Sequence, residues 1–208
     1  MSKFQAYLVF GAPGAGKGTQ GRALGTVPGY YHFACGDVFR SLDLSTPLGR
    51  QFLDYSGRGE LVPDEVTIEL WKTRMKQAVE AGAFHPEHDY LVLDGIPRNV
   101  RQARMLEDTI HVCRVFHLSC PDRRKLVERL KRRALRDNRL DDANEEVIRL
   151  RLETYDQESF PVISHYGEKL VERLDASMSP IEVLAKITAV LIKDRAGRAG
   201  EEGFSAPE

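Results

Sequence analysis

The sequence predicts an α/β fold with three layers, in which a five-stranded parallel sheet lies between helices. Two observations support this prediction. Short apolar stretches alternate with amphipathic stretches, which is typical of strands joined by helices in a parallel sheet. The first apolar stretch is followed by a glycine-rich turn that opens a helix, as in doubly wound sheets. We expect strands near residues 5–10, 32–34, 90–94, 112–118 and 169–174.

Length and composition predict one globular domain with small inserted lobes. The chain has 208 residues, of which 42% are hydrophobic and 29% are charged. This size and composition fit a single core rather than two. We assign residues 1–195 to the domain. Residues 196–208 are mostly small or polar, and we expect them to form a disordered tail.

Charge and hydropathy exclude several classes of partner. The net charge of −1 gives no general field that attracts nucleic acid or a membrane surface, so any strong positive potential must be local. No apolar run approaches the roughly 20 residues that a bilayer requires, and the N-terminus lacks the apolar core of a signal peptide. We therefore expect a cytoplasmic protein that binds neither nucleic acid nor membrane.

The first predicted strand leads into the stretch Gly11-Ala-Pro-Gly-Ala-Gly-Lys17-Gly-Thr-Gln20. Glycines let successive backbone N–H groups turn inward around an anion, and the N-terminus of the following helix adds partial positive charge. Lys17 can reach the outer phosphates of a nucleotide. A glycine-rich turn alone is a weak signal, because turns collect glycine for steric reasons. The combination of strand, turn, lysine and helix predicts a phosphate-binding loop for a nucleoside triphosphate.

Position 18 departs from the usual pattern of such loops. Most of them carry a Ser or Thr there, whose hydroxyl ligates magnesium, whereas this chain has Gly18 and places Thr19 one residue late. We therefore expect Mg²⁺ to be held by the phosphates and by water, with carboxylates orienting the waters. Asp37 and Asp94 are the candidates, because both follow predicted strands whose carboxyl ends meet at one edge of the sheet. Asp-Gly pairs such as the one at Asp94 also occur in simple turns, but the neighbouring loop favours the magnesium role.

Residues 47–81 interrupt the alternation, since they supply helical segments without a strand. The pairs Thr46-Pro47 and Val62-Pro63 resemble helix starts. We expect an inserted helical lobe in this part of the chain.

The cysteines give no sign of a disulfide framework or a metal site. Cys35, Cys113 and Cys120 are odd in number and lack Cys-x-x-Cys spacing, so we expect reduced thiols.

Basic residues are dense between positions 123 and 151. Arg129 and Arg133 are one helical turn apart and share a face, Arg139 follows across a short loop, and Arg151 lies on the next helix. Taken alone, basic residues on a helix usually form a solvated face. We expect such a face for Arg123, Arg124, Lys125, Lys131, Arg132 and Arg136.

Five further stretches follow the loop along the chain. They are Cys35-Gly-Asp-Val-Phe-Arg40, Gly59-Glu-Leu-Val62, Asp94-Gly-Ile-Pro-Arg-Asn-Val-Arg-Gln102, and Arg139-Leu-Asp-Asp142 with Arg149-Leu-Arg-Leu-Glu-Thr-Tyr155. Together with the loop, these motifs resemble those of adenylate kinases and related nucleoside monophosphate kinases, in the same order. The resemblance covers residues 6 to about 190, and it is much more specific than any one motif.

The resemblance implies an ATP site between the loop and a short lid at residues 133–142. Arg129 and Arg133 would contact the ATP phosphates, while Arg139 and Arg151 would bridge to the transferring phosphate. An arginine there is worth on the order of a thousandfold or more in rate. Ala143 lengthens the spacing to Arg151 by one residue relative to the family pattern, so Arg149 competes for that role. The implied ATP-binding residues are Gly14, Ala15, Gly16, Lys17, Gly18, Thr19, Arg129, Arg133 and Met178.

The lid also bears on metal content. Some bacterial relatives pin a long lid with four metal ligands, but here the segment is short and holds no Cys or His. We therefore expect no structural zinc.

The resemblance makes residues 47–81 a monophosphate-binding lobe. Arg40 and Arg98 would hold the monophosphate, and the Gln102 amide offers a donor and an acceptor to a purine edge. Adenylate kinases place Gln at this position, whereas pyrimidine monophosphate kinases commonly place Asn. Cys35 is the counter-observation, since adenylate kinases usually carry Thr there. The implied AMP-binding residues are Cys35, Arg40, Glu60, Leu61, Val62, Gly95, Ile96, Pro97, Arg98, Gln102, Arg139 and Arg151.

The implied activity is reversible transfer of the terminal phosphoryl group of magnesium ATP to AMP, giving two ADP. The implied catalytic residues are Lys17, Arg98, Arg133, Arg139 and Arg151. One alternative is a UMP/CMP kinase. A remote alternative is an ATP-binding regulatory module without turnover, which would leave the arginines and the acceptor motif without a purpose. The resemblance also implies a monomer.

Overall fold

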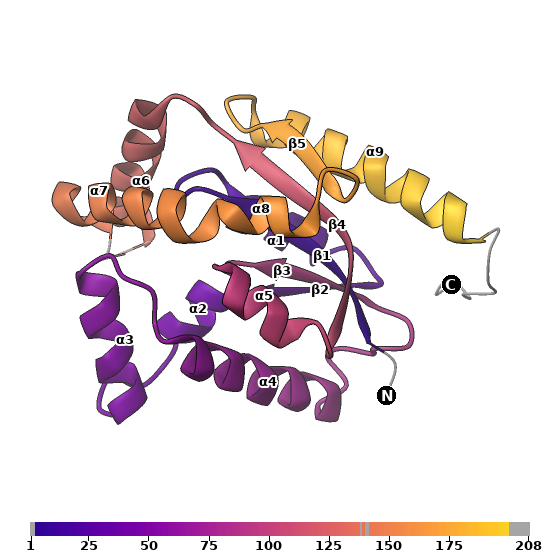
Figure 1. The fold of residues 1–208 in the computed structure, drawn as a ribbon, viewed down its shortest axis with the longest axis horizontal. Helices are drawn as coiled ribbons and strands as arrows, with labels where there is room; N and C mark the ends of the chain where they lie inside the picture. The colour runs from indigo at the N-terminus through magenta and orange to yellow at the C-terminus, as the bar shows by residue number, and fades with distance from the viewer. Residues whose placement is uncertain (1–2, 138, 140–141, 200–208) are drawn as a thin grey trace.

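A five-stranded sheet in the order β2-β3-β1-β4-β5 forms the centre of the computed structural model, which describes residues 3–137, 139 and 142–199 (Figure 1). All neighbouring strands run parallel, which confirms the predicted fold class. All five predicted strands are present, with ends shifted by at most two residues. The strands are β1 (Phe4–Gly11), β2 (Tyr30–Ala34), β3 (Tyr90–Asp94), β4 (Ile110–Ser119) and β5 (Val171–Asp175).

Helices cover both faces of this sheet because its strands alternate apolar side chains between the two faces. On one face, Phe4 of β1 packs against Trp71 of α4 (Asp64–Glu80). On the other, Tyr7 of β1 packs against Tyr30, which is hydrogen-bonded to Arg195 of α9. The first face also carries α5 (Val100–Leu106) and α8 (Pro161–Tyr166), and the second carries α1 (Lys17–Leu24) and α9 (Pro180–Ala199).

Three helices, and no strand, lie between β2 and β3. They are α2 (Cys35–Arg40), α3 (Pro47–Gly57) and α4. The Thr46 hydroxyl accepts a hydrogen bond from the Gly49 N–H and Pro47 opens α3, so this helix starts where the sequence predicts. Pro63 lies one position earlier relative to its helix, since it is the N-cap residue of α4 rather than its first helical residue.

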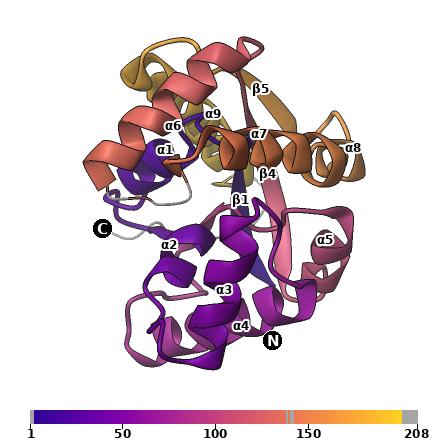
Figure 2. The same ribbon diagram turned by 90° about the vertical axis from the view of Figure 1, so that its left-hand side faces the viewer.

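The chain after β4 forms α6 (Arg123–Asp137), α7 (Glu145–Thr154) and the π-helical turn η2 (Tyr155–Ser159). Figure 2 shows α6 and α7 on one side of the molecule and α3 on the other. The predicted lid at 133–142 comprises the end of α6 and the segment that follows it, of which residues 138, 140 and 141 are outside the described part of the chain.

The C-terminal helix is longer than expected. Helix α9 continues to Ala199, so residues 196–199, which the sequence assigned to the tail, are helical. Alanine and arginine are among the strongest helix formers, and they outweigh the single Gly197. The remaining tail residues, 200–208, lie outside the described residues. Within the part of the chain that is described, no helix combines the length and apolar character needed to cross a membrane.

Candidate active site

The parallel register brings the predicted motifs to one end of the sheet. Val9 of β1 and Ala34 of β2 both pair with Asp94 of β3, so the segments that follow these strands start side by side. A cavity of about 650 Å³ opens at this end, within the size range of ligand pockets. The motifs therefore converge as the sequence predicts, although they are far apart along the chain.

The glycine-rich loop wraps around the Lys17 side chain. Lys17 Nζ donates hydrogen bonds to the carbonyl oxygens of Gly11, at 2.7 Å, and Ala12, at 3.1 Å. Gly14 has a φ of +84°, and a Cβ there would lie 2.8 Å from the Leu126 carbonyl oxygen of α6. Glycine is therefore required at position 14 both by backbone conformation and by the close approach of α6.

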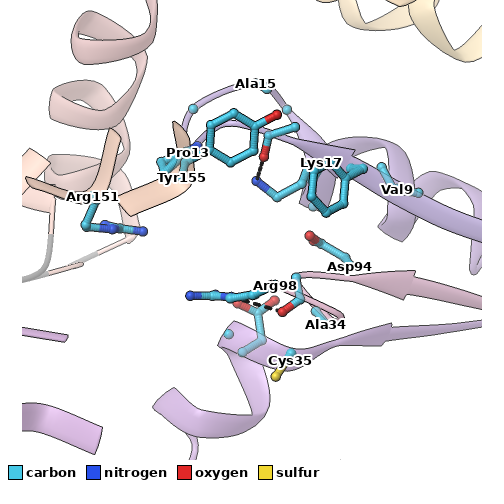
Figure 3. A pocket seen from close by; sticks show the side chains of 18 of the residues that line it. Val9, Pro13, Ala15, Lys17, Ala34, Cys35, Asp94, Arg98, Arg151 and Tyr155 are labelled. Carbon is cyan, nitrogen blue, oxygen red and sulfur yellow. Dashed lines mark hydrogen bonds between the residues drawn. The ribbon is translucent and has the colours of Figure 1, made fainter. Parts of the chain in front are cut away.

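Cations from three separate segments surround the Lys17 ammonium group. Figure 3 shows Lys17, Arg98 and Arg151 extending toward the same space from the loop, from the segment after β3 and from α7. Burial lowers the pKa of Lys17 to about 8, and the charges of Arg98, Arg133 and Arg151 add to this effect, while Asp94 opposes it. Positive charge is thus concentrated where a polyphosphate would neutralise it.

Asp142 orients two of the predicted arginines. Its fully buried carboxylate accepts a 2.6 Å hydrogen bond from Arg133 Nε and another from Arg151 Nη1. Arg149 instead extends into solvent and pairs with Glu153 on its own helix. The structure therefore favours Arg151 over Arg149 as the residue that faces the cavity.

Helix α6 borders the cavity with four arginines. The two predicted site residues, Arg129 and Arg133, line it together with Arg132 and Arg136. Arg132 and Arg136 are nevertheless exposed to solvent, and the Arg136 side chain is 72% exposed and pairs with Asp137, so the expected solvated face is present at these two positions. Arg129 is fixed by a 2.8 Å hydrogen bond from Nη1 to the Ala176 carbonyl oxygen.

Asp37 is engaged by arginines from three elements. Its carboxylate contacts Arg40 at 2.7 Å, Arg139 at 3.0 Å and Arg22 at 3.4 Å. Burial alone would raise the pKa of Asp37, but the Arg40 hydrogen bond and the three positive charges lower it. Arg139 thereby links the segment between α6 and α7 to α2.

Asp94 lies beside the position where phosphate-binding loops usually carry a metal-ligating hydroxyl. A Cβ built on Gly18 would be 3.3 Å from Asp94 Oδ2 and 3.4 Å from Arg22 Nη1. The absence of a side chain at position 18 therefore lets a carboxylate oxygen approach the loop closely, and such an oxygen is the kind of donor that Mg²⁺ and its waters prefer.

The opposite part of the cavity contains Cys35, Arg98 and Gln102. Burial raises the pKa of the Cys35 thiol to about 11, so the thiol is neutral at physiological pH. Arg98 Nε donates a 3.0 Å hydrogen bond to the Gly95 carbonyl oxygen. The Gln102 amide is also held by protein groups, because Oε1 accepts from the Arg98 backbone N–H and Nε2 donates to Asp64.

All but one of the predicted site residues line the cavity. They are Gly14, Ala15, Gly16, Lys17, Gly18, Thr19, Arg129, Arg133 and Met178 on one side, Cys35, Arg40, Glu60, Leu61, Val62, Gly95, Pro97, Arg98, Gln102, Arg139 and Arg151 on the other, with Asp37 and Asp94 between them. Ile96 is the exception, since its side chain is only 2% exposed and packs into the core.

The sequence does not predict the buried pair formed by His117 and Tyr155. Tyr155, which lines the cavity, has its hydroxyl 3.2 Å from His117 Nε2. Burial and the charge of Arg173 lower the pKa of His117 to about 4, so this imidazole is neutral at pH 7. The contact joins β4 to the start of η2, and no local sequence pattern predicts it.

Comparison with known proteins gives a consistent result. The family model described as "Adenylate kinase" matches residues 9–171. The adenylate kinase of Thermobifida fusca is 36% identical over 196 residues, covering 91% of this chain and 98% of the relative. That of Thermus thermophilus is 35% identical over 194 residues, covering 90% and 97%. That of Kocuria rhizophila is 37% identical over 190 residues, covering 88% and 97%.

Proposed function

The chain belongs to the adenylate kinase family, and on this premise we propose how its cavity transfers a phosphoryl group from ATP to AMP. The enzyme is an adenylate kinase, which moves the terminal phosphoryl group of ATP to AMP reversibly and forms two ADP. One observation carries the proposed arrangement. Lys17, Arg98, Arg133 and Arg151 come from four separate segments of the chain and line one cavity.

ATP binds along the loop and α6. The backbone N–H groups of the loop and Lys17 hold its phosphates, and Arg129 and Arg133 approach them from the lid side. The loop's contact with α6 at Gly14 keeps these two groups at a fixed separation. Met178, which lines the cavity, would contact the nucleoside of ATP.

AMP binds at the opposite end, against the helices inserted between β2 and β3. Arg40 and Arg98 hold its phosphate, and Cys35 and Gln102 lie next to its base. In the reaction, an AMP phosphate oxygen attacks the γ-phosphorus of ATP, and the bond from that phosphorus to the β–γ bridging oxygen breaks. The attacking oxygen is anionic, so the step needs positioning and positive charge rather than a general base.

Arg139 and Arg151 complete the positive charge around the transferring group. The pairing of Arg151 and Arg133 with buried Asp142 limits the motion of both guanidinium groups, so less ordering is required when substrates bind. Closure of the 47–81 lobe and the 133–142 lid would exclude water from the reaction. Adenylate kinases are a well-known case of lid closure over bound substrates, so this step is carried over by analogy with the family.

Asp94 is the residue that would hold Mg²⁺ through water, because its carboxylate oxygen borders the cavity next to Gly18 of the phosphate-binding loop. When bound, the metal ion would supply positive charge to the ATP phosphates. Asp37 is the weaker of the two predicted candidates, because three arginines already engage its carboxylate. Asp94 would orient metal-bound water.

We propose that the protein needs no structural zinc. Among the described residues, no group of three or more His, Cys, Asp or Glu side chains is arranged to hold a metal ion. We expect the melting temperature to be unchanged after dialysis against a strong chelator, and activity to need added Mg²⁺. A melting temperature that falls on chelation and recovers with zinc would contradict this expectation.

We also propose that the enzyme is a cytoplasmic monomer that binds ATP and AMP but neither nucleic acid nor membrane.

A coupled assay with AMP, UMP, CMP and GMP as acceptors tests the function. We expect AMP to give the highest kcat/KM at saturating ATP. A preference for UMP or CMP would instead identify a pyrimidine monophosphate kinase. Binding of ATP without turnover of any acceptor would identify a regulatory module.

A further inference from the structure

The amide of Gln102 is held in one orientation before any ligand binds. Its Oε1 accepts a 2.7 Å hydrogen bond from the Arg98 backbone N–H, and its Nε2 donates a 2.9 Å hydrogen bond to Asp64 Oδ1. Gln102 is 1% exposed, so these contacts are shielded from bulk water. The two partners come from different elements, one from the segment after β3 and the other from the first turn of α4.

These two partners cannot exchange roles. A backbone N–H only donates, and the Asp64 carboxylate, which also accepts from Asn99 Nδ2 at 2.9 Å, only accepts. A rotated amide would place Oε1 against the carboxylate and Nε2 against the N–H. Both contacts would be repulsive, and both hydrogen bonds would be lost. The Gln102 amide therefore adopts a single orientation, with its oxygen toward the Arg98 N–H and its nitrogen toward Asp64.

The same amide retains capacity for a ligand. An amide oxygen accepts two hydrogen bonds and an amide nitrogen donates two. Within the described part of the chain, the amide oxygen and the amide nitrogen of the Gln102 side chain each have one protein partner, and the residue lines the cavity. One acceptor position on Oε1 and one donor position on Nε2 therefore remain for a ligand. Arg98 and Asp64 determine on which side of the amide each of them lies.

The arrangement of donor and acceptor matters because purines differ in the donor and acceptor groups that they present. Adenine presents an amino donor beside a ring-nitrogen acceptor, whereas guanine and hypoxanthine present a carbonyl acceptor beside a ring N–H donor. An amide that can rotate freely matches either edge, and a fixed amide matches only one. We propose that Asp64 is a positioning residue that fixes the Gln102 amide and makes the acceptor site select adenine over guanine and hypoxanthine. This inference rests on the proposed function, in which Gln102 contacts the acceptor base.

The test replaces Asp64 by a group that can either donate or accept. In Asp64→Asn, the asparagine can turn its amide and donate to Gln102 Oε1, so one of the two contacts that oppose rotation of the Gln102 amide is relieved while the Arg98 N–H remains. We expect the ratio of kcat/KM for AMP to that for IMP or GMP to fall by up to about tenfold, through loss of the penalty at position 64. The KM for ATP should stay unchanged. A purely structural role would reduce the use of all three acceptors alike.

Glu65→Gln is the matched control. Glu65 is the next residue, its side chain is 59% exposed, and it contacts Arg101, which also lies 3.7 Å from Asp64. We expect this variant to keep the wild-type acceptor ratio. A similar fall in both variants would overturn the inference, since it would reflect loss of charge near Arg101 rather than release of the amide.

Gln102→Ala separates this inference from the proposed function. If Gln102→Ala lowers the ratio but Asp64→Asn does not, the positioning role is wrong and the acceptor site stands. If Gln102→Ala also leaves the ratio unchanged, the assignment of Gln102 to the base is wrong. Should Asp64→Asn fail to fold, NMR of the wild type decides. In the free protein we expect a scalar coupling across the hydrogen bond between the Arg98 backbone nitrogen and the Gln102 side-chain carbonyl carbon, whose signal is assigned by its loss in Gln102→Ala. Absence of this coupling would overturn the proposal.

Discussion

At the donor end of the cavity, backbone carbonyls hold Lys17 and Arg129, whereas at the acceptor end Gln102 is held in part by another side chain. Lys17 is bonded to the carbonyl oxygens of Gly11 and Ala12, and Arg129 to that of Ala176. Gln102, by contrast, depends on the Asp64 carboxylate for half of its orientation. Backbone geometry is fixed by the fold as a whole, while a side-chain contact is lost with one substitution. The donor end should therefore respond chiefly to loss of charge, and the acceptor end to subtle changes in hydrogen bonding.

The largest effect should come from Lys17→Met. We expect turnover to fall about a thousandfold or more, because Lys17 is the cation in the centre of the loop. The melting temperature should not fall, since the change removes a buried charge from beside Arg98 and Arg133. A coupled assay and thermal unfolding measure the two quantities. Turnover within tenfold of the wild type would show that the donor end does not depend on this charge.

The next largest effect should separate two neighbouring arginines. Arg151→Lys should lower kcat roughly a hundredfold, because lysine cannot reproduce the forked guanidinium that bridges Asp142 and the transferring group. Arg149→Lys should stay within about twofold, because its pair with Glu153 is exposed and worth about 0.5 kcal/mol or less. Equal losses in the two variants would contradict the assignment of Arg151 to the cavity.

A smaller effect is expected at the acceptor end from Cys35→Thr. Burial keeps the thiol neutral, and a thiol is a weak hydrogen-bonding group compared with a hydroxyl. A gained neutral hydrogen bond is worth roughly 0.5–1.5 kcal/mol, so the preference for AMP over CMP and GMP should rise by about tenfold at most. The ratios of kcat/KM at saturating ATP measure it. Gln102→Ala should lower the same ratios more strongly, and the opposite ranking would place base recognition at Cys35.

The smallest predicted effect is the uptake of a proton by Lys17 when ATP binds. The pKa of Lys17 is lowered from 10.5 to about 8 in the free protein, so between these pH values the folded state binds fewer protons than the unfolded state. Stability from this group therefore rises with pH across that window. Bound phosphates should raise the pKa again, and ATP binding near pH 9 should take up a fraction of one proton. Calorimetry in buffers of different ionisation enthalpy measures the uptake. The Lys17→Met variant is its control, and equal uptake by both proteins would contradict it.

The amino-acid sequence determined the features that depend on local pattern. Strand positions follow from short apolar runs, and the loop follows from glycines that backbone conformation and close packing require, as at Gly14. The convergence of Asp37 and Asp94 followed from a general rule for parallel sheets, since their strands end at the same edge. The start of α3 followed from a cap and a proline that act within one turn.

Only the tertiary structure decided which side of each helix faces the cavity. The rotation of α7 about its axis directs Arg151 toward the cavity and Arg149 into solvent, because this rotation depends on packing against distant elements. Ile96 lies inside a motif, yet the local turn directs its side chain into the core. The pairs Gln102 with Asp64 and Tyr155 with His117 join residues 38 apart in the sequence in each case. No periodicity encodes such contacts, since they exist only once two separate elements have packed together.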